Sequence, residues 1–202
     1  MLYLIRHGQT EHNLARRLQG RSDSPLTPEG AEQARRMGAC LRREIGGEAR
    51  VELVCSPLGR ARRTAEIVRE VLGVPGPVRL DERLAEIDVG AWEGKSGEEI
   101  GIDASGPHAR YAWLYQAPGG EGETALYARL RGFLDDLDET DGQVRIVVSH
   151  GVAGWALRHL YCGEQDQDRP PQEAVFHLSQ GSIRRVDELA QAELLASAPA
   201  GR

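Results

Sequence analysis

Two short motifs place a histidine directly after an apolar, strand-like run. One is RHG at residues 6–8, after the run LYLI, and the other is SHG at residues 149–151, after the run VRIVV. A neutral imidazole can accept a phosphoryl group when a hydrogen bond to its second ring nitrogen aims it. A single histidine of this kind is usually structural, but two of them after two strands predict that His7 and His150 face one pocket.

Arginines and carboxyl groups near these motifs would complete such a site. Arg6 adjoins the first histidine, and Arg60 follows the run VELVC in the first turn of an expected helix. Free backbone amides and the helix dipole favour an anion at that place. A carboxyl group is needed to protonate a leaving oxygen, and the segment RLAEIDVGAWEG offers Glu86, Asp88 and Glu93. Spacing alone does not choose among these three acids.

Strand-like and helical segments alternate along the chain, and these elements would have to position the groups named above. Strand-like apolar runs lie at residues 2–5, 51–55 and 144–149, and helical apolar periods lie at 34–45, 58–72, 126–137 and 152–160. This alternation predicts an α/β fold with three layers, α/β/α, in which a mostly parallel sheet carries helices on both faces. Ligands bind at the carboxyl ends of the strands in such sheets, where both histidines stand.

Two hydroxyl residues followed by proline mark expected helix starts. At Thr27-Pro28 and at Ser56-Pro57, the hydroxyl is expected to be the N-cap and the proline the first helical residue. Near the end of the chain we expect two short strands, at residues 174–178 and 182–186, and then a helix beyond Glu188.

The chain is expected to form one domain over residues 1–202, because its length suits a single α/β core. Within it, a Gly- and Pro-rich stretch predicts a short cap insertion at about residues 95–122. This insertion is expected to be irregular, apart from a short helix that contains Tyr111, Trp113 and Leu114.

The composition argues against several classes of partner. The net charge is −6 and the pI about 5.6, so the chain as a whole repels nucleic acids and anionic membrane surfaces. Three cysteines lie far apart without zinc-binding spacing, so we expect reduced thiols and no metal or organic cofactor. The apolar start is too short for a signal peptide and no long apolar run follows, so the expected compartment is the cytoplasm. The oligomeric state stays open, with a homodimer as one alternative.

Five motifs resemble the ordered signatures of the histidine phosphatase superfamily, the phosphoglycerate-mutase-like proteins, in its branch of small phosphatases. They are RHGQTEHN, GRSDSPLTPEGAEQA, SPLGRARRTAE, RLAEIDVGAWEG and SHG, and all five lie between Leu4 and Gly151. Each motif alone is a weak signal, whereas five in the family's order are specific. The resemblance implies a metal-independent phosphatase that hydrolyses small phosphorylated metabolites through a phosphohistidine.

The resemblance also assigns roles to residues of this chain. His7 would be the nucleophile, and Glu86 would protonate the leaving oxygen and later activate water. The groups that would surround the phosphoryl oxygens are Arg6, Arg60 and His150. The expected substrate contacts are Asn13, Gln19, Gly20, Arg21 and Gly151.

One segment departs from the pattern of the family. Many members carry GGES or GES before a late long helix, whereas residues 118–124 of this chain read PGGEGET. Either Glu121 or Glu123 could be the counterpart of the family's glutamate, so the role of this loop toward the substrate stays open. Thr124 is expected only to cap the helix that follows.

Three other functions compete with hydrolysis at His7. A mutase of the same family would need a more enclosed and more cationic cap, and residues 94–118 offer only Lys95, His108 and Arg110. A cysteine-based phosphatase would need five residues between Cys55 and its arginine, and the spacing fails because residue 61 is Ala. A catalytically inactive module that binds phosphorylated ligands is the third alternative. We therefore favour the phosphatase.

Overall fold

A six-stranded sheet forms the centre of the protein. The computed structural model describes residues 1–46, 50–101, 113–137 and 142–162, and the backbone of 183–185 and 193–194. The strands are β1 (Leu2–Arg6), β2 (Val51–Cys55), β3 (Arg79–Leu80), β4 (Val144–Ser149), β5 (Ile183–Arg185) and β6 (Glu193–Leu194). Their order is β3-β2-β4-β1-β5-β6; the first four are parallel, and β5 and β6 are antiparallel to their neighbours. The predicted α/β fold with a mostly parallel sheet is confirmed.

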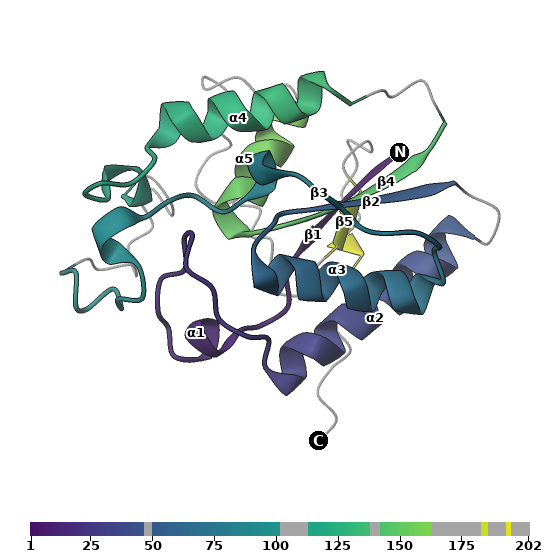
Figure 1. Ribbon diagram of the computed structural model, residues 1–202, viewed down its shortest axis with the longest axis horizontal. Coiled ribbons are helices and arrows are strands. Elements are labelled where there is room, and N and C mark those ends of the chain that lie inside the picture. Colours follow the sequence, from purple (N-terminus) through teal and green to yellow (C-terminus); the bar gives the residue numbers. More distant parts are fainter. Residues whose placement is uncertain (47–49, 102–112, 138–141, 163–182, 186–192, 195–202) are drawn as a thin grey trace.

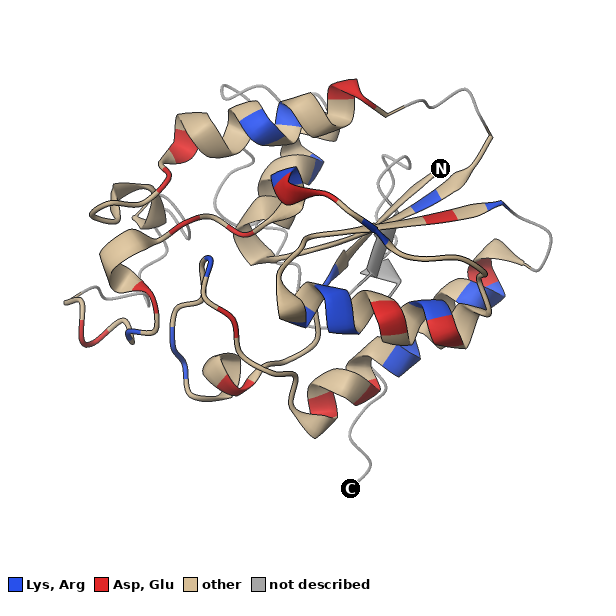
Figure 2. Cartoon of the chain, viewed as in Figure 1, with Lys and Arg blue, Asp and Glu red and all other residues tan. Residues whose placement is uncertain are grey.

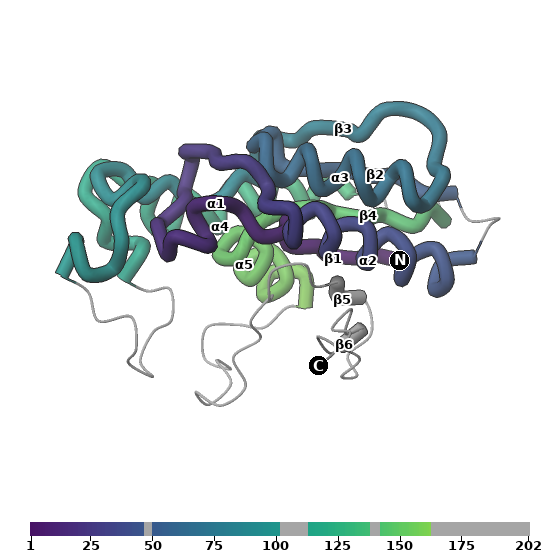
Figure 3. The backbone as a smooth tube through the Cα atoms, turned by 90° about the horizontal axis from the view of Figure 1, so that it is seen from below, coloured from purple at the N-terminus to yellow at the C-terminus, as the bar shows by residue number. Residues whose placement is uncertain are grey.

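Helices cover both faces of this sheet (Figure 1). The helices are α1 (Glu11–Leu14), α2 (Pro28–Ile45), α3 (Gly59–Leu72), α4 (Glu123–Asp135) and α5 (Gly151–Tyr161), and three 3₁₀ turns are η1 (Glu82–Leu84), η2 (Gly90–Trp92) and η3 (Leu114–Gln116). Helices α2 and α3 pack side by side on one face, as Figure 3 shows, and α4 and α5 lie on the other. The three predicted layers are therefore present.

Alternating side chains of the parallel strands fill two apolar cores, one under each pair of helices. In β1, Leu2 and Leu4 join the core beside α4 and α5, whereas Tyr3 and Ile5 join the core beside α2 and α3. Each of these four side chains is at most 4% exposed, and burying one such chain contributes about 1.5–3 kcal/mol before the loss of entropy. The three tryptophans, Trp92, Trp113 and Trp155, all pack against the core beside α4 and α5.

The two predicted hydroxyl caps have different outcomes. Thr27 caps α2 as expected, because its hydroxyl accepts the N–H of Gly30 at 3.0 Å and Pro28 is the first helical residue. The predicted cap at Ser56 is wrong: α3 starts at Gly59, after the N-cap Leu58, with no hydrogen bond from a capping side chain. Ser56 instead bonds to a histidine, as described below.

Other boundaries also differ from the sequence prediction. Helix α4 begins at Glu123 after the N-cap Gly122 and has no side-chain cap, so the predicted cap by Thr124 is wrong. The strand predicted at residues 182–186 is confirmed as β5. The helix predicted beyond Glu188 is wrong at Glu193–Leu194, which form β6.

Part of the predicted cap and tail lies outside the described residues. Of the short helix predicted to contain Tyr111, Trp113 and Leu114, only Leu114 is confirmed as helical, in η3, and Trp113 is the N-cap of that turn. Tyr111, Arg110 and His108 lie outside the described residues, as does the strand predicted at residues 174–178.

Charged residues of both signs are mixed along α2 and α3 (Figure 2). Examples are the pairs Arg35–Glu32 at 3.0 Å and Arg63–Glu66 at 3.3 Å, each three residues apart on one helix. Exposed pairs of this kind stabilise a helix by about 0.2–0.5 kcal/mol each. Among the described residues, no helix has the length and apolar character that a membrane crossing requires.

Candidate active site

The two histidines of the sequence motifs lie together where β1 and β4 end. These strands are parallel neighbours, and the N–H of His7 donates to the carbonyl of Ser149 at 3.1 Å. The ring centroids of His7 and His150 are 5.1 Å apart, with their planes at 60°. Both residues are buried, with exposures of 3% and 0%. The expectation that both rings converge on one place agrees with this geometry.

One ring nitrogen of His7 is fixed by the backbone. Its Nδ1 lies 2.7 Å from the carbonyl oxygen of Gly8, which can only accept a hydrogen bond, so Nδ1 carries the hydrogen. Burial, and then the positive charges of Arg60 and Arg6, hold the pKa of His7 well below its ordinary value near 6.5, although the bond to Gly8 opposes this shift. The ring is therefore neutral at pH 7, with a lone pair on Nε2.

His150 is oriented by Ser56 through a 2.7 Å hydrogen bond between Nε2 and Oγ. The Ser56 oxygen accepts the N–H of Leu58 at 3.3 Å, so its own hydrogen is available for Nε2. In that tautomer Nδ1 of His150 carries a hydrogen, and among the described residues this buried atom has no hydrogen-bond partner. It can therefore donate to an anion.

We predict that the two neutral histidines make the stability of the protein depend on pH. Burial and the charge of Arg60 lower the pKa of both rings. As the pH falls through 6.5, the unfolded chain therefore binds up to two more protons than the folded one, and the free energy of unfolding falls. Urea unfolding should show a loss of about 2–3 kcal/mol between pH 7.5 and 5.5.

A double variant, His7→Gln with His150→Gln, is the control for this pH dependence. Its unfolding free energy should change much less over the same interval, because glutamine does not titrate. An equal pH slope in wild type and double variant would show that other groups cause it.

A cavity of about 170 Å³ opens beside His7. It is lined by Arg6, His7, Asn13, Arg17, Leu18, Gln19, Glu86, Ile87, Val89, Leu114, Gly151 and Val152. Six predicted site residues thus line one cavity: Arg6, His7, Asn13, Gln19, Glu86 and Gly151. Four others are not among its lining residues, namely Gly20, Arg21, Arg60 and His150.

The carboxylate of Glu86 is held at the N-terminus of α5. Its Oε1 accepts the N–H groups of Ile87 at 3.0 Å and Ala153 at 2.9 Å, and its Oε2 accepts that of Val152 at 3.1 Å. A carboxylate has about four lone-pair sites, so one remains for a proton. Glu86 is 6% exposed and lines the cavity beside His7.

Arg60 is clamped by the loop of residues 20–23. Its Nη1 donates to the carbonyl of Ser22 at 2.8 Å and to Asp23 at 3.1 Å, and its Nη2 donates to the carbonyl of Gly20 at 2.8 Å. Burial lowers the pKa of Arg60, while the carboxylates of Glu86 and Asp23 oppose the shift. Among the described residues its buried Nε has no hydrogen-bond partner. Arg60 lies in the first turn of α3, as the sequence predicts.

Glu93 organises the loop that clamps Arg60, a role that the sequence did not indicate. Its two carboxylate oxygens accept the N–H groups of Gly20, Arg21 and Ser22 at 3.1, 2.6 and 3.1 Å, and also the hydroxyl of Ser22. Burial alone would raise the pKa of Glu93, but the hydrogen bonds from Ser22 and the amides lower it below its ordinary value. Glu93 is therefore an anion that positions this loop.

Replacement of Glu93 should weaken phosphate binding and catalysis, although Glu93 does not line the cavity beside His7. In Glu93→Gln the side-chain amide has one oxygen and an NH₂ group that would face backbone N–H donors. We expect the carbonyls of Gly20 and Ser22 to shift and kcat/KM for p-nitrophenyl phosphate to fall by about 10²-fold, because misplacing a positioning group by about 1 Å has that effect. Inhibition by inorganic phosphate should weaken in parallel.

Glu66→Gln is the matched control, since among the described residues Glu66 has its ion pair with Arg63 on α3 and does not line the cavity beside His7. It should leave kcat/KM and phosphate inhibition unchanged. If Glu93→Gln lowered only the melting temperature and bound phosphate as wild type does, Glu93 would be structural alone.

Glu121 and Arg129 hold the segment that carries Glu86. Arg129 donates to Glu121 through Nε at 2.5 Å and Nη2 at 3.0 Å, and to the carbonyls of Arg83 and Glu86. Glu121 also pairs with Arg21 at 3.7 Å. Glu121 thus helps to hold Arg129 against the segment that carries Glu86, and it does not itself line the cavity.

Asn13 and Gln19 are fixed through Thr10. The Oδ1 atom of Asn13 accepts the N–H and hydroxyl of Thr10 at 3.1 and 2.9 Å, and Nε2 of Gln19 lies 2.5 Å from the same hydroxyl. The Asn13 carbonyl is therefore engaged, and its NH₂ group is the part that can donate to a ligand. The buried Oε1 of Gln19 has no hydrogen-bond partner among the described residues.

Two glycines beside the histidines lie in tightly packed positions. A Cβ at Gly8 would lie 2.2 Å from the carbonyl oxygen of Gly30, so this glycine lets α2 approach the end of β1. A Cβ at Gly151 would lie 3.3 Å from the guanidinium carbon of Arg6. Gly151 therefore leaves room for Arg6 in the cavity.

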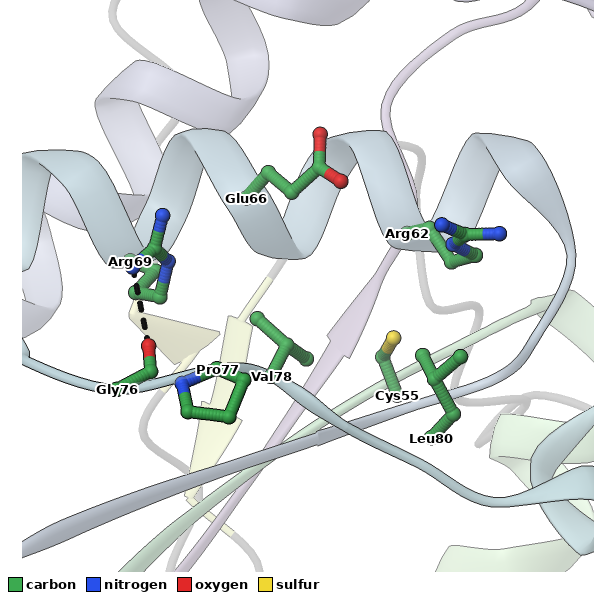
Figure 4. Close-up of a pocket in the computed structure, with 8 residues that line it drawn as sticks. All are labelled: Cys55, Arg62, Glu66, Arg69, Gly76, Pro77, Val78 and Leu80. Atoms are coloured by element: carbon green, nitrogen blue, oxygen red, sulfur yellow. Dashed lines mark hydrogen bonds between the residues drawn. The ribbon is translucent and has the colours of Figure 1, made fainter.

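A larger cavity, of about 440 Å³, lies between α3 and residues 76–80, beside the end of β2 (Figure 4). Cys55 faces it, near Arg62 and Leu80. Burial raises the pKa of the Cys55 thiol to about 12, against the opposing charge of Arg62. A protonated thiol is a poor nucleophile, so this cavity gives no support to a cysteine-based phosphatase. Among the described residues, no cluster of three or more His, Cys, Asp or Glu could hold a metal ion.

Known proteins resemble this chain in sequence and structure. The sequence model of the histidine phosphatase superfamily (branch 1) matches residues 2–193. "Probable phosphoglycerate mutase GpmB" from Salmonella paratyphi C is 36% identical over 156 residues, which cover 75% of this chain and 70% of that protein. The structure of a mycobacterial glucosyl-3-phosphoglycerate phosphatase with VO3 has a TM-score of 0.73 and 30% identity, covering 90% of both chains. Alpha-ribazole phosphatase from Shigella flexneri has a TM-score of 0.67 and 29% identity, covering 90% of this chain and 87% of that one.

Proposed function

Because this chain belongs to the histidine phosphatase superfamily, we propose that it is a phosphatase that hydrolyses small phosphate monoesters through a phosphohistidine on His7. The observation that carries the proposal is the buried, neutral His7, which lines a cavity together with Arg6 and Glu86 and whose ring lies 5.1 Å from that of His150. A nucleophilic nitrogen, cationic groups for the phosphoryl oxygens and a carboxyl group for the leaving oxygen meet there. Phosphoryl transfer depends mainly on such positioning and on charge stabilisation.

In the proposed first step, Nε2 of His7 attacks phosphorus and the bond to the leaving oxygen breaks. The bond between Nδ1 and Gly8 keeps the lone pair on Nε2. A proton held by Glu86 goes to the leaving oxygen, so an alcohol departs and Glu86 becomes a carboxylate. Arg6, Arg60 and His150 stabilise the charge on the phosphoryl oxygens.

In the second step, the Glu86 carboxylate takes a proton from a water molecule as its oxygen attacks phosphorus. The P–N bond breaks, and its electron pair returns to Nε2 of His7. Inorganic phosphate leaves, and Glu86 is protonated again for the next cycle. Dividing a slow hydrolysis into two displacements lowers the barrier of each.

The GpmB likeness makes a phosphoglycerate mutase the second candidate. A mutase must keep water from the phosphohistidine while the product reorients and accepts the phosphoryl group. The test uses 3-phosphoglycerate and follows free phosphate and 2-phosphoglycerate together. Phosphate release without 2-phosphoglycerate supports the phosphatase, as does the absence of both products from protein that hydrolyses p-nitrophenyl phosphate. Interconversion without phosphate release would establish the mutase.

A further inference from the structure

Two chemically different sets of side chains line the cavity beside His7. The polar set is Arg6, His7, Asn13, Arg17, Gln19 and Glu86. The apolar set is Leu18, Ile87, Val89, Leu114 and Val152. This second set, called the apolar wall here, comes from four separate parts of the chain. A leaving group attached to the phosphoryl group has to share the cavity with it.

The apolar wall is fixed by the core. Ile87 and Val89 are 1% and 2% exposed, Val152 and Leu114 are 5% and 6% exposed, and all four belong to the core beside α4 and α5. Leu18 packs against the same core, and its backbone N–H and carbonyl pair with Lys95 and Gly94. A surface packed in this way is preformed and binds without a large cost of ordering.

Cations that could recognise a second anion on the leaving group are engaged elsewhere. Of the described residues, Arg6 and Arg17 are the cations that line the cavity. Arg17 donates to the carbonyl of Gly94 at 2.6 Å and pairs with Glu99 at 3.5 Å. Arg21 pairs with Glu121 and is not a lining residue. Arg6 is the cation assigned to the phosphoryl group itself.

We infer that the leaving group of the substrate is compact and apolar and carries no second negative charge; this inference rests on the proposed function. A carboxylate or second phosphate would lose water against the apolar wall, where the described lining offers it no uncommitted cation, which is unfavourable. The cavity of about 170 Å³ must also hold the phosphoryl group, so the room left for the leaving group is no larger than an engineered apolar cavity of about 150 Å³ that accepts benzene. A branched alkyl group or a single ring is therefore the class of leaving group that fits.

Two esters of matched shape test this inference on the wild-type protein. 3-Methylbutyl phosphate and 3-(phosphonooxy)propanoate have leaving groups of the same outline, but the second ends in a carboxylate where the first has two methyl groups. We expect kcat/KM to be about tenfold or more higher for 3-methylbutyl phosphate, the size of discrimination that an apolar pocket provides. Equal values, or a preference for the carboxylate, would overturn the inference.

A charge placed in the apolar wall should change the preference. In Leu18→Arg the new guanidinium can pair with the substrate carboxylate, so the ratio of the two kcat/KM values should fall by about tenfold, mainly through KM. Leu14→Arg is the matched control, because Leu14 is 62% exposed and does not line the cavity. It should keep the wild-type ratio, and an equal change in both variants would contradict a role for the wall.

The same assays separate this inference from the proposed function. Phosphate release and a phosphohistidine on His7 with both esters, but without the preference, would refute the apolar leaving group and leave the phosphatase standing. Failure of p-nitrophenyl phosphate and of both esters to give either product would refute both proposals together.

Discussion

The variant His7→Ala should lower kcat/KM for p-nitrophenyl phosphate by about 10⁴-fold or more, the scale seen when a covalent nucleophile is removed. Alanine has no lone pair to attack phosphorus, and the remaining cations can only bind the ester. The protein should still fold, because the His7 ring is held by one hydrogen bond to a neighbouring carbonyl. The measurement is steady-state release of p-nitrophenol, with the melting temperature as a check of folding.

His12→Ala is the matched control for His7→Ala. His12 lies five residues further along in α1 and is not a lining residue of the cavity, so its loss should change activity little. Wild-type protein quenched at alkaline pH during turnover should carry one phosphoryl group on the peptide that contains His7. A label on any other residue would contradict the proposed mechanism.

The second large effect is expected from Glu86→Gln and should depend on the leaving group. Loss of the proton donor should slow the hydrolysis of an alkyl phosphate by about 10²–10⁴-fold. The first turnover of p-nitrophenyl phosphate should change by less than about tenfold, because p-nitrophenolate leaves without a proton. Rapid-quench measurement of the first turnover, with both esters, tests this difference.

Asp88→Asn is the control for Glu86→Gln. The carboxylate of Asp88 accepts the N–H of Gly90 at 2.7 Å and does not line the cavity. This variant should therefore retain activity with both esters. If Asp88→Asn lost more activity than Glu86→Gln, or if Glu86→Gln slowed both esters equally, Glu86 would not be the acid.

The sheet and the pairing of the two histidines could be predicted because their signals are local. Each histidine follows a run of buried strand residues, and parallel strands that are neighbours end at the same edge of the sheet. The register confirms this, since Arg6 of β1 pairs with Ser149 of β4. β3 was not predicted, because two residues, Arg79–Leu80, are too few to show a period.

The groups that support the site could not be predicted because their partners are distant in sequence. Glu93 accepts hydrogen bonds from residues 71 to 73 positions away, so it looked only like one of three candidate acids. Ser56 has the sequence context of an N-cap, yet its hydroxyl bonds to His150, 94 positions away. A serine hydroxyl has a single hydrogen to donate, and tertiary contacts decide whether it bonds to a nearby backbone group or to a distant side chain.

The position of the tryptophans on one side of the sheet determines what intrinsic fluorescence can report. Trp92, Trp113 and Trp155 all pack in the core beside α4 and α5, so emission follows solvent exposure of that half alone. Far-ultraviolet circular dichroism, in contrast, follows helices on both faces. Coincident denaturation curves from the two signals would indicate that both cores melt as one cooperative unit, whereas separate midpoints would show that α2 and α3 lose structure independently.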